Sequence, residues 1–589
     1  MSLLGLILIT AGVLLGAYRS YSQVLSRLLR LDPQAPTPAF TLRDDVDYQP
    51  LEPNALLSQH FSAIAAAGPI VGPILAGLMF GWLPALLWIV VGSILIGGVH
   101  DFTALVASIR HKARSIAEVV RDHMSRRAYL MFLSFVWLAL VYIIVAFTDI
   151  TAASFVGRQA LDNGEVVTGA GIASSSLMYL ALPIIMGLLL RYSGVRLGVA
   201  TAIFLPLVAL SIYAGQRWPF DLTTWLQLVY PAADDRVAHK VWDILLLIYC
   251  CIASVVPMWL LLQPRGHLGG YFLYVALGGG MLGLLVSGIQ GQTSVTYPAF
   301  TGWWSTRGDA LFPMLFITIA CGACSGFHAL IASGTTSKQL RYETDARLIG
   351  YGAMLLEAMV AVLSLCCVMR LAPASPLVQG TPNLIYAEGI GSFLQTLGIP
   401  AAWAVSFALM AFTTFVYDTL DVCTRLGRYI IQELIGRHDR VGRWIGTLVT
   451  AGVPVFFVMQ TLHDAQGQVV PLWRVFWALF GASNQLLAAL TLLGVTVWLW
   501  KTTGAWWVWL VTGLPTLWMY TMSTWALARM IQGLLRELST RPSVPSVTYI
   551  LLAVSSLLVM LALFMLVEAS TILWPRRQGS PPTAVSAPA

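Results

Sequence analysis

The sequence predicts an all-α membrane protein whose helices cross a lipid bilayer many times. Hydrophobic residues make up 58% of the 589 residues, whereas charged residues make up only 10%. A soluble domain carries roughly a quarter charged residues, so lipid must be the solvent for most of this chain. The 50 glycines and 21 tryptophans agree, since both residues are common in membrane helices or at their interfaces. The composition excludes a soluble enzyme, a nucleic-acid-binding protein and a disordered chain.

Apolar runs long enough to cross a bilayer, which takes about 20 residues, occur fifteen times. The short alternating strands of a membrane β-barrel are not seen in the sequence. The first run has no basic segment before it, so we expect a retained helix rather than a signal peptide. The predicted spans are residues 2–18, 59–80, 82–107, 128–148, 174–191, 195–214, 241–262, 270–291, 310–335, 346–370, 397–420, 443–460, 471–500, 505–527 and 546–574.

The positions of lysine and arginine predict the orientation. If the N-terminus lies outside, 24 of the 34 basic residues fall in cytoplasmic loops, as the positive-inside rule requires. Arg425 and Arg428 are interpreted as cytoplasmic anchors of this kind. The segment 529–541, with its three arginines, falls outside and disagrees. The net charge of +7 therefore records topology rather than an anionic partner.

Helix-breaking residues inside the spans mark candidate sites, because irregular backbone in a membrane survives only where it lines a cavity. The clearest is Gly68-Pro69-Ile70-Val71-Gly72-Pro73, for which we expect an unwound stretch. A kink with close packing through Gly68 and Gly72 is the structural alternative. A second, weaker break is Ser254-Val255-Val256-Pro257, because a single proline often only kinks a helix.

A third stretch is small and polar at membrane depth. It runs from Cys321 to His328 and leads to Ser333-Gly334-Thr335-Thr336. Tight helix packing through its glycines is the structural alternative. A Cys-x-x-Cys pair can bind a metal or act in redox chemistry, but no second pair accompanies this one, and we predict no metal site.

Ionisable side chains inside the spans are functional candidates, because they are costly in lipid. Glu357 lies deepest in an apolar run, and we favour a function as an ion-pair partner or a proton-carrying carboxyl. For Asp101 and Asp421 the functional and structural explanations are equally open. For His60 and Asp418 we prefer a structural hydrogen bond or an interfacial position.

These motifs resemble the signature of the carbon starvation protein A family. The likeness covers about residues 20–574. The chain departs from longer members by having one N-terminal span fewer, a short connection over 370–397, and His100 where members often have Gln; Asp418 lies outside the motif. The matching stretches are 60–65, 68–73, 99–102, 257–262 with Pro264-Arg265, 315–330, 333–336, Tyr351-Gly352 with Glu357, 421–428 and 480–488.

The resemblance implies an inner-membrane transporter linked to carbon starvation. Peptide uptake is the usual description of the family, and some members import pyruvate with protons. The family is thought similar to the amino acid–polyamine–organocation superfamily, whose LeuT-like fold has two inverted repeats of five helices. In that scheme 59–80 is core helix 1, 241–262 is helix 6 and 310–335 is helix 8. The implied parts are an N-terminal helix and connection (1–58), a ten-helix transport core (59–425), additional membrane helices (426–574) and a disordered cytoplasmic tail (575–589).

The implied activity is secondary active uptake by alternating access, driven by H⁺ or Na⁺, in a bacterial or archaeal cytoplasmic membrane. Free N–H groups at helix ends near 68–73 and 254–257 would hold the substrate carboxylate. Carboxylates would carry a proton, and hydroxyls with carbonyls near Gly68 would hold Na⁺. No cofactor beyond the coupling ion, and no nucleic-acid partner, is expected; the sequence does not indicate an oligomeric state. The expected substrate-binding residues are Gly68, Pro69, Gly72, Ser254, Pro257, Ser325 and His328, and the expected ion-coupling residues are Asp101, Ser333, Thr335, Thr336, Glu357 and Asp421.

A membrane nutrient sensor and an intramembrane enzyme are the two alternative functions. A membrane nutrient sensor normally carries a soluble signalling domain, yet the longest loops have only about 40 residues. An intramembrane enzyme would need a motif such as His-Glu-x-x-His or a nucleophile elbow, and the sequence has neither. The sequence also has no Walker A pattern, so we expect an ion gradient rather than ATP to supply the energy.

Overall fold

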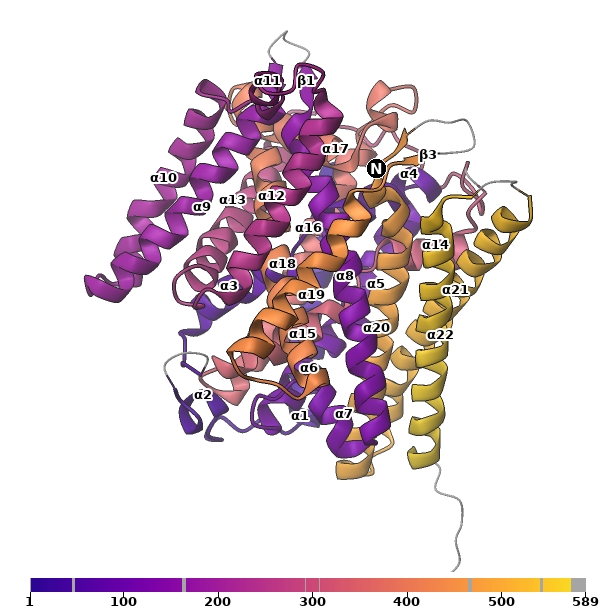
Figure 1. Ribbon diagram of the computed structural model, residues 1–589. Coiled ribbons are helices and arrows are strands. Elements are labelled where there is room, and N and C mark those ends of the chain that lie inside the picture. The colour runs from indigo at the N-terminus through magenta and orange to yellow at the C-terminus, as the bar shows by residue number, and fades with distance from the viewer. Residues whose placement is uncertain are drawn as a thin grey trace, which may run out of the picture.

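The computed structural model describes residues 2–44, 48–160, 166–291, 293–306, 308–463, 469–540 and 544–573. Within these residues the chain is a bundle of 22 α-helices with two small β-hairpins (Figure 1). The all-α class predicted from the sequence is therefore confirmed. The expected cytoplasmic tail, 575–589, lies outside the described residues.

The helices of the first half begin with one outer helix and end with a long pair. They are α1 (Leu3–Leu28), α2 (Pro38–Thr41), α3 (Pro53–Ile64), α4 (Gly68–Phe80), α5 (Trp82–Gly92), α6 (Gly98–Arg110), α7 (Ile116–His123), α8 (Arg126–Val156), α9 (Gly169–Tyr192), α10 (Leu197–Arg217), α11 (Leu222–Gln227), α12 (Asp235–Val255) and α13 (Leu262–Ile289).

The second half opens with two short helices. Its helices are α14 (Leu311–Thr318), α15 (Gly326–Gly334), α16 (Ala353–Met369), α17 (Pro382–Gln395), α18 (Ala401–Ile435), α19 (Arg440–Val458), α20 (Leu472–Thr503), α21 (Leu514–Thr540) and α22 (Ser546–Leu573). The π turns are η1 (Ser93–Gly97), η4 (Arg347–Gly352) and η6 (Trp509–Gly513), and the 3-10 turns are η2 (Thr336–Lys338), η3 (Glu343–Asp345) and η5 (Pro376–Gln379).

The β-strands among the described residues form two antiparallel hairpins, beside two isolated bridges at Ser2–Ser294 and Trp304–Ala310. In the first, β1 (Arg158–Ala160) pairs with β2 (Val166–Thr168), with Arg158 opposite Thr168. In the second, β3 (Leu462–His463) pairs with β4 (Val469–Val470). Both hairpins join helices, so they do not change the fold class.

Twelve helices of the described chain are long and apolar enough to cross a membrane, and thirteen if the bent pair α3 and α4 counts as one span. The prediction of fifteen spans is therefore too high. The run 310–335 forms two short helices, α14 and α15, because a non-helical stretch interrupts it. The run 505–527 lies on η6 and α21, where polar residues such as Thr516 and Ser523 dilute the apolar ones. The expected loop 529–541 is helical as far as Thr540.

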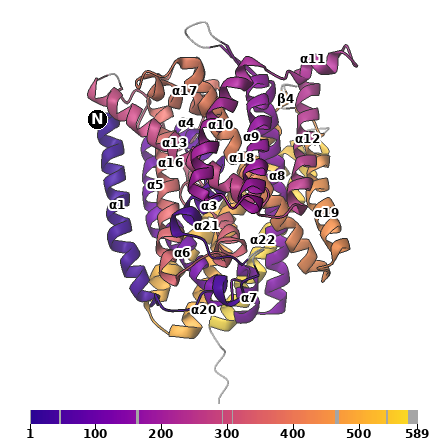
Figure 2. The same cartoon turned by 90° about the vertical axis from the view of Figure 1, so that its left-hand side faces the viewer.

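Burial separates the central helices from the outer ones. In the most apolar stretch of α20 94% of residues are buried, against 28% in α1, which stands at the edge of the bundle (Figure 2). The hairpin α9–α10 and the pair α21–α22 form opposite flanks (Figure 1). Leucine and isoleucine side chains on these outer helices face outward, as expected where lipid is the solvent.

The central helices pack in a fixed set of neighbours. Helix α3 lies along α13, α4 lies along α16, and α6 lies against η4. Helix α8 packs against α18 and α20, and α12 packs against α19. This packing brings the interrupted helices, α3/α4 and α14/α15, to the middle of the bundle.

Candidate functional site

The two interrupted helices touch each other at their breaks. Helices α3 and α4 meet at an angle of 47° across residues 65–67, and α14 and α15 are separated by residues 319–325. A methyl group added at Gly72 would lie 2.4 Å from the carbonyl oxygen of Thr318, and one added at Gly68 would lie 2.4 Å from Cys321 Cβ. Only glycine, which has no Cβ, allows this close approach. Gly68 and Gly72 therefore permit the two breaks to lie in contact.

The first break lies three residues earlier than predicted. The expected unwound stretch, 68–73, forms the first turns of α4, and the chain leaves the helix at 65–67 instead. Pro69 lies in the first turn, where a helix has no use for its missing N–H. Pro73 is accommodated inside α4. The prolines thus define where the second half-helix begins rather than where the backbone unwinds.

The predicted break at 254–257 is present, but it is the wrong end of a helix for binding a carboxylate. Helix α12 ends at Val255, and Val256 is extended. This C-terminal end presents carbonyl groups rather than the expected free N–H groups, and Arg425 Nη2 donates to the Ala253 oxygen at 2.7 Å and to the Val256 oxygen. Ser254 Oγ lies 3.3 Å from Thr447 Oγ1 on α19. Arg425, interpreted as a surface anchor, is 5% exposed and closes this helix end.

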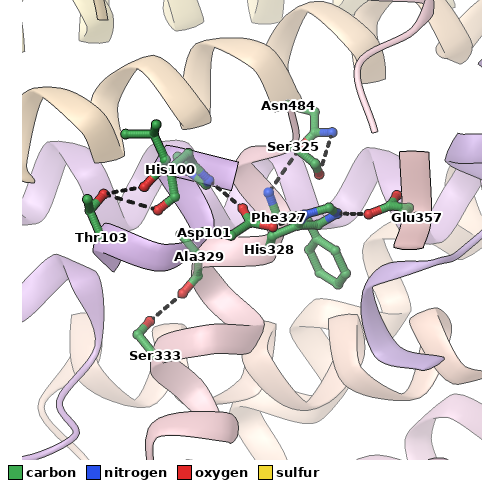
Figure 3. A network of polar contacts seen from close by, with 11 residues as sticks. His100, Asp101, Thr103, Ser325, Phe327, His328, Ala329, Ser333, Glu357 and Asn484 are labelled. Atoms are coloured by element: carbon green, nitrogen blue, oxygen red, sulfur yellow. Dashed lines mark hydrogen bonds and ion pairs between the residues drawn. The ribbon is translucent and has the colours of Figure 1, made fainter. Parts of the chain in front are cut away.

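A chain of four fully buried side chains runs beside the second break (Figure 3). His100 Nδ1 lies 2.7 Å from Asp101 Oδ1, and Asp101 Oδ2 lies 2.7 Å from His328 Nδ1. On the other side of the ring, His328 Nε2 lies 3.1 Å from Glu357 Oε2. The chain joins three helices: α6 carries His100 and Asp101, α15 carries His328 and α16 carries Glu357.

An asparagine holds the start of α15 in place. Asn484 Oδ1, on α20, accepts a hydrogen bond from the Phe327 N–H at 3.0 Å, and its amide nitrogen donates to Ser325 Oγ at 3.0 Å. The same amide lies 3.3 Å from Cys321 Sγ. Asn484 therefore satisfies the helix end that precedes His328 by two residues, and it fixes the position of that imidazole (Figure 3).

The three hydroxyls expected to hold Na⁺ do not face one place. Ser333 Oγ donates to the Ala329 oxygen and accepts from the Ile116 N–H at the start of α7. Thr335 Oγ1 donates back to the carbonyl oxygen one turn earlier in α15, at 3.1 Å. Thr336 Oγ1 lies 2.8 Å from His60 Nδ1 on α3. Gly68 packs against Cys321 instead, so the expected grouping of these hydroxyls with carbonyls near Gly68 is not formed.

A second polar cluster surrounds Arg265, in the first turn of α13. Its guanidinium forms ion pairs with Asp418, at 2.9 Å from Nε to Oδ1, and with Asp421. Tyr249 on α12 donates to Asp421 Oδ2 at 2.8 Å, and Ser62 on α3 donates to Asp418. Arg265 is 1% exposed. Buried charges of this kind persist only when they are paired.

A small pocket of about 30 Å³ lies beside the Arg265 cluster. His60, Arg265, Thr336, Asp418 and Asp421 are among its lining residues. This volume holds about two water molecules, which is less than a pyruvate or a peptide occupies. The clusters are therefore enclosed in this conformation, and a substrate reaches them only after the helices move.

Sequence reasoning missed three residues of the Arg265 cluster and pocket. The expected spans 241–262 and 270–291 leave Arg265 in the loop between them, although Pro264 just before it is typical of a helix start. His60 and Asp418 were given structural explanations, and both line the pocket. Their polarity inside or beside apolar runs was the available signal, but which side chains they meet depends on helices far away in the sequence.

Comparison with known proteins relates most of the chain to one family. The sequence profile of the family "Carbon starvation protein CstA" matches residues 2–383 and 374–526. The peptide transporter CstA of Helicobacter pylori is 32% identical over 544 residues, with 82% of this chain and 76% of the relative covered. The pyruvate/proton symporter BtsT of Escherichia coli is 30% identical over 583 residues, with 85% and 78% covered.

Two solved structures align with most of this chain at low TM-scores. MhsT in complex with L-phenylalanine has a TM-score of 0.46 at 12% identity, covering 88% of this chain and 99% of that chain. A manganese transporter of Eremococcus coleocola has a TM-score of 0.41 at 14% identity, covering 90% and 99%. The curated relatives are transporters, which confirms the prediction of a transporter rather than an enzyme. The chain is a multi-pass membrane protein that belongs to the carbon starvation protein CstA family of transporters.

Proposed function

We propose that the chain is a proton-coupled secondary transporter that takes up a small carboxylate such as pyruvate, or short peptides, across a bacterial cytoplasmic membrane. The observation that carries this proposal is the buried chain from Asp101 through His328 to Glu357, next to the contact between the two interrupted helices. The two relatives named for peptide and for pyruvate transport are equally similar to this chain, so both substrates are retained.

The protonation chemistry follows from how His328 is placed. Each ring nitrogen meets one carboxylate, so the doubly protonated ring can donate to Asp101 and Glu357 together. With both carboxylates ionised and His100 neutral, the group carries one negative charge, and uptake of one proton makes it neutral. In a buried setting each such change is large in energy. Because His328 lies on α15 and Glu357 on α16, the proton sets the attraction between these helices and so favours one conformation.

The substrate would bind in an enlarged form of the pocket at Arg265, near the buried side chains of Asp101, His328 and Glu357. Peptides and pyruvate share a carboxylate, and two features here suit one. Arg265 supplies a guanidinium, which can pair with a carboxylate through two hydrogen bonds. The first turn of α4, at Gly68, supplies the positive end of a helix dipole. A bound substrate would compete with Asp418 and Asp421 for Arg265.

An inverted repeat is supported by the order of the elements. Each set has an interrupted helix, a helix containing a π turn, a short helix, a long helix and two more helices. In Figure 1 α4 lies above α3 and α14 lies above α15, so the interrupted helices run in opposite directions. Corresponding helices pack together, as α8 does with α18 and α12 with α19. The sets are α3/α4, α5–η1–α6, α7, α8, α12 and α13, and α14/α15, η4–α16, α17, α18, α19 and α20.

This order revises the parts proposed from the sequence. The second interrupted helix of the repeat is 310–335 instead of 241–262, and the transport core extends to Thr503 rather than ending at 425. The pair α9–α10 is an insertion between α8 and α12, and α1, α21 and α22 lie outside the repeat. We retain the orientation with the N-terminus outside and the C-terminus in the cytoplasm, which the distribution of Lys and Arg supports.

Uptake into proteoliposomes tests the proposal. Labelled pyruvate and a labelled dipeptide are offered to the purified chain under an imposed proton gradient or an imposed sodium gradient. We expect a proton gradient to drive accumulation of one of them, and Glu357→Gln to abolish this dependence. Glu52→Gln is the matched control, because the Glu52 side chain is 68% exposed in an ion pair with Arg341.

Two outcomes would contradict the proposal. Accumulation of neither substrate would remove the transport assignment for these chemical classes. Full-rate, proton-dependent uptake by the Glu357→Gln variant would remove Glu357 from the coupling. Uptake driven by sodium alone would favour the second coupling ion considered from the sequence.

A further inference from the structure

A third cluster of ionisable side chains lies away from both sites described above. It consists of Asp149, near the end of α8, and of His239 and Asp243, one turn apart on α12. Their ligand atoms all lie within 4.8 Å of one another. The cluster lies where α8 approaches β1 and where α12 begins after α11; Figure 1 labels both β1 and α11. Neither the proposed proton chain nor the Arg265 cluster uses it.

The spacing of the three side chains suits a shared ion. His239 Nε2 lies 3.2 Å from Asp149 Oδ1 and 3.8 Å from Asp243 Oδ2. Ligand atoms that bind one Zn²⁺ at about 2.0–2.2 Å lie roughly 3–3.5 Å apart. A small movement of Asp243 would bring all three atoms to that separation.

Asp243 provides the observation that points to a missing partner. Its side chain is 0% exposed, and among the described residues neither of its carboxylate oxygens accepts a hydrogen bond. A buried carboxylate without donors is costly. The nearest candidate is the imidazole of His239, which at 3.8 Å is beyond hydrogen-bond distance.

The surroundings hold the other groups in place. Asp149 Oδ2 accepts a hydrogen bond from the Trp473 N–H at 2.8 Å, which leaves Oδ1 facing His239. The ammonium of Lys240 donates to the carbonyls of Val458 and Gln460, so this lysine is committed to another segment. His239 is 22% exposed, which gives an ion access from outside.

We propose that Asp149, His239 and Asp243 form a binding site for a divalent transition-metal ion, with Zn²⁺ as the best match. One imidazole and two carboxylates are ligands that Zn²⁺ accepts in a four-coordinate site, with solvent at the remaining position. The bound ion would cancel the charge of the two carboxylates and would fasten α8 to α12. A competing explanation is a protonated His239 held between the carboxylates, with no metal.

Zinc binding to the full-length protein in detergent separates these explanations. The protein is stripped with a chelator, incubated with ZnCl₂, freed of excess metal and analysed for metal content. We expect one Zn²⁺ per chain, and a rise in the thermal unfolding midpoint when Zn²⁺ is added. Asp243→Asn should weaken the affinity by more than about 100-fold, because loss of a second-shell partner alone costs roughly 10- to 100-fold.

Asp234→Asn, at the N-cap of α12, is the matched control. Asp234 is exposed, and it accepts hydrogen bonds from the N–H groups of Arg236 and Val237, which an asparagine oxygen also accepts. This variant should bind Zn²⁺ like the wild type. His239→Ala, at a partly exposed position, repeats the test if Asp243→Asn does not yield folded protein.

Two results would overturn the site. In the first, the wild-type protein that was stripped, incubated with ZnCl₂ and freed of excess metal holds no more Zn²⁺ than the Asp243→Asn or His239→Ala variant treated in the same way. In the second, Zn²⁺ raises the unfolding midpoint of either ligand variant as much as that of the wild type. Either result would leave the three side chains as an ion triad centred on His239.

Discussion

Placing a methyl group at the contact between the two helix breaks should destabilise the protein, and removing the opposing side chain should restore it. In Gly68→Ala the new Cβ would lie 2.4 Å from both Cβ and Sγ of Cys321, whereas ordinary contacts begin at 3.4 Å. The overlap is 1.0 Å at two atoms. Overpacking of a tight core costs about 1–3 kcal/mol, and we expect a loss of this size in the free energy of unfolding.

The double variant Gly68→Ala with Cys321→Gly supplies the decisive comparison. It removes both overlapping atoms and leaves Cys321 Cα at an ordinary 3.8 Å. Cys321→Gly alone loses the contact with Asn484 and should also destabilise, so the restored part appears as a coupling energy of about 1 kcal/mol or more. Unfolding in detergent and uptake into proteoliposomes measure it. The reasoning is refuted if Gly68→Ala is as stable as the wild type, or if the two single effects add without coupling.

Three further changes test other contacts. Arg265→Gln leaves two buried carboxylates without their partner, so we expect a loss of about 3–5 kcal/mol of unfolding free energy, partly restored by adding Asp421→Asn. Asn484→Ala leaves the Phe327 N–H at the start of α15 unpaired and should cost about 1–3 kcal/mol, measured in the same unfolding assay. Burial, and next the charge of His111 whose Nε2 is 2.9 Å away, lower the pKa of His123 below its usual 6.5. The neutral form is therefore favoured in the fold, so stability is complete above about pH 6.5 and falls below it; His123→Gln should flatten this part of a thermal unfolding profile measured against pH.

The positions of the apolar helices could be predicted from the sequence, because lipid burial needs long apolar runs. The breaks were harder to place. In the run 310–335 the non-helical residues are small ones such as Cys321 and Ser325, with no proline among 319–325, so the sequence looked like one continuous helix. In the run 68–73 the prolines were conspicuous, but Pro69 begins a helix and does not unwind one.

The residues of the candidate proton chain could be predicted singly but not as a group. Asp101, His328 and Glu357 were each singled out because each is polar inside an apolar run. That His328 lies between the two carboxylates depends on how α15 packs against α6 and α16, and a single sequence does not contain this information. Arg265 was missed because a charge near the end of an apolar run has two explanations, a loop and a buried ion pair, that look alike in sequence.

The composition of the first break determines how the bundle can bend. Residues 65–67 are three alanines, so the connection at which α3 and α4 meet at 47° carries no side chain larger than a methyl group. Helix α3 packs along α13, and α4 packs along α16. In the proposed transport cycle we expect the alanine segment to act as a hinge, so that the α3–α13 pair moves relative to α15 and α18 and opens the pocket toward one side of the membrane.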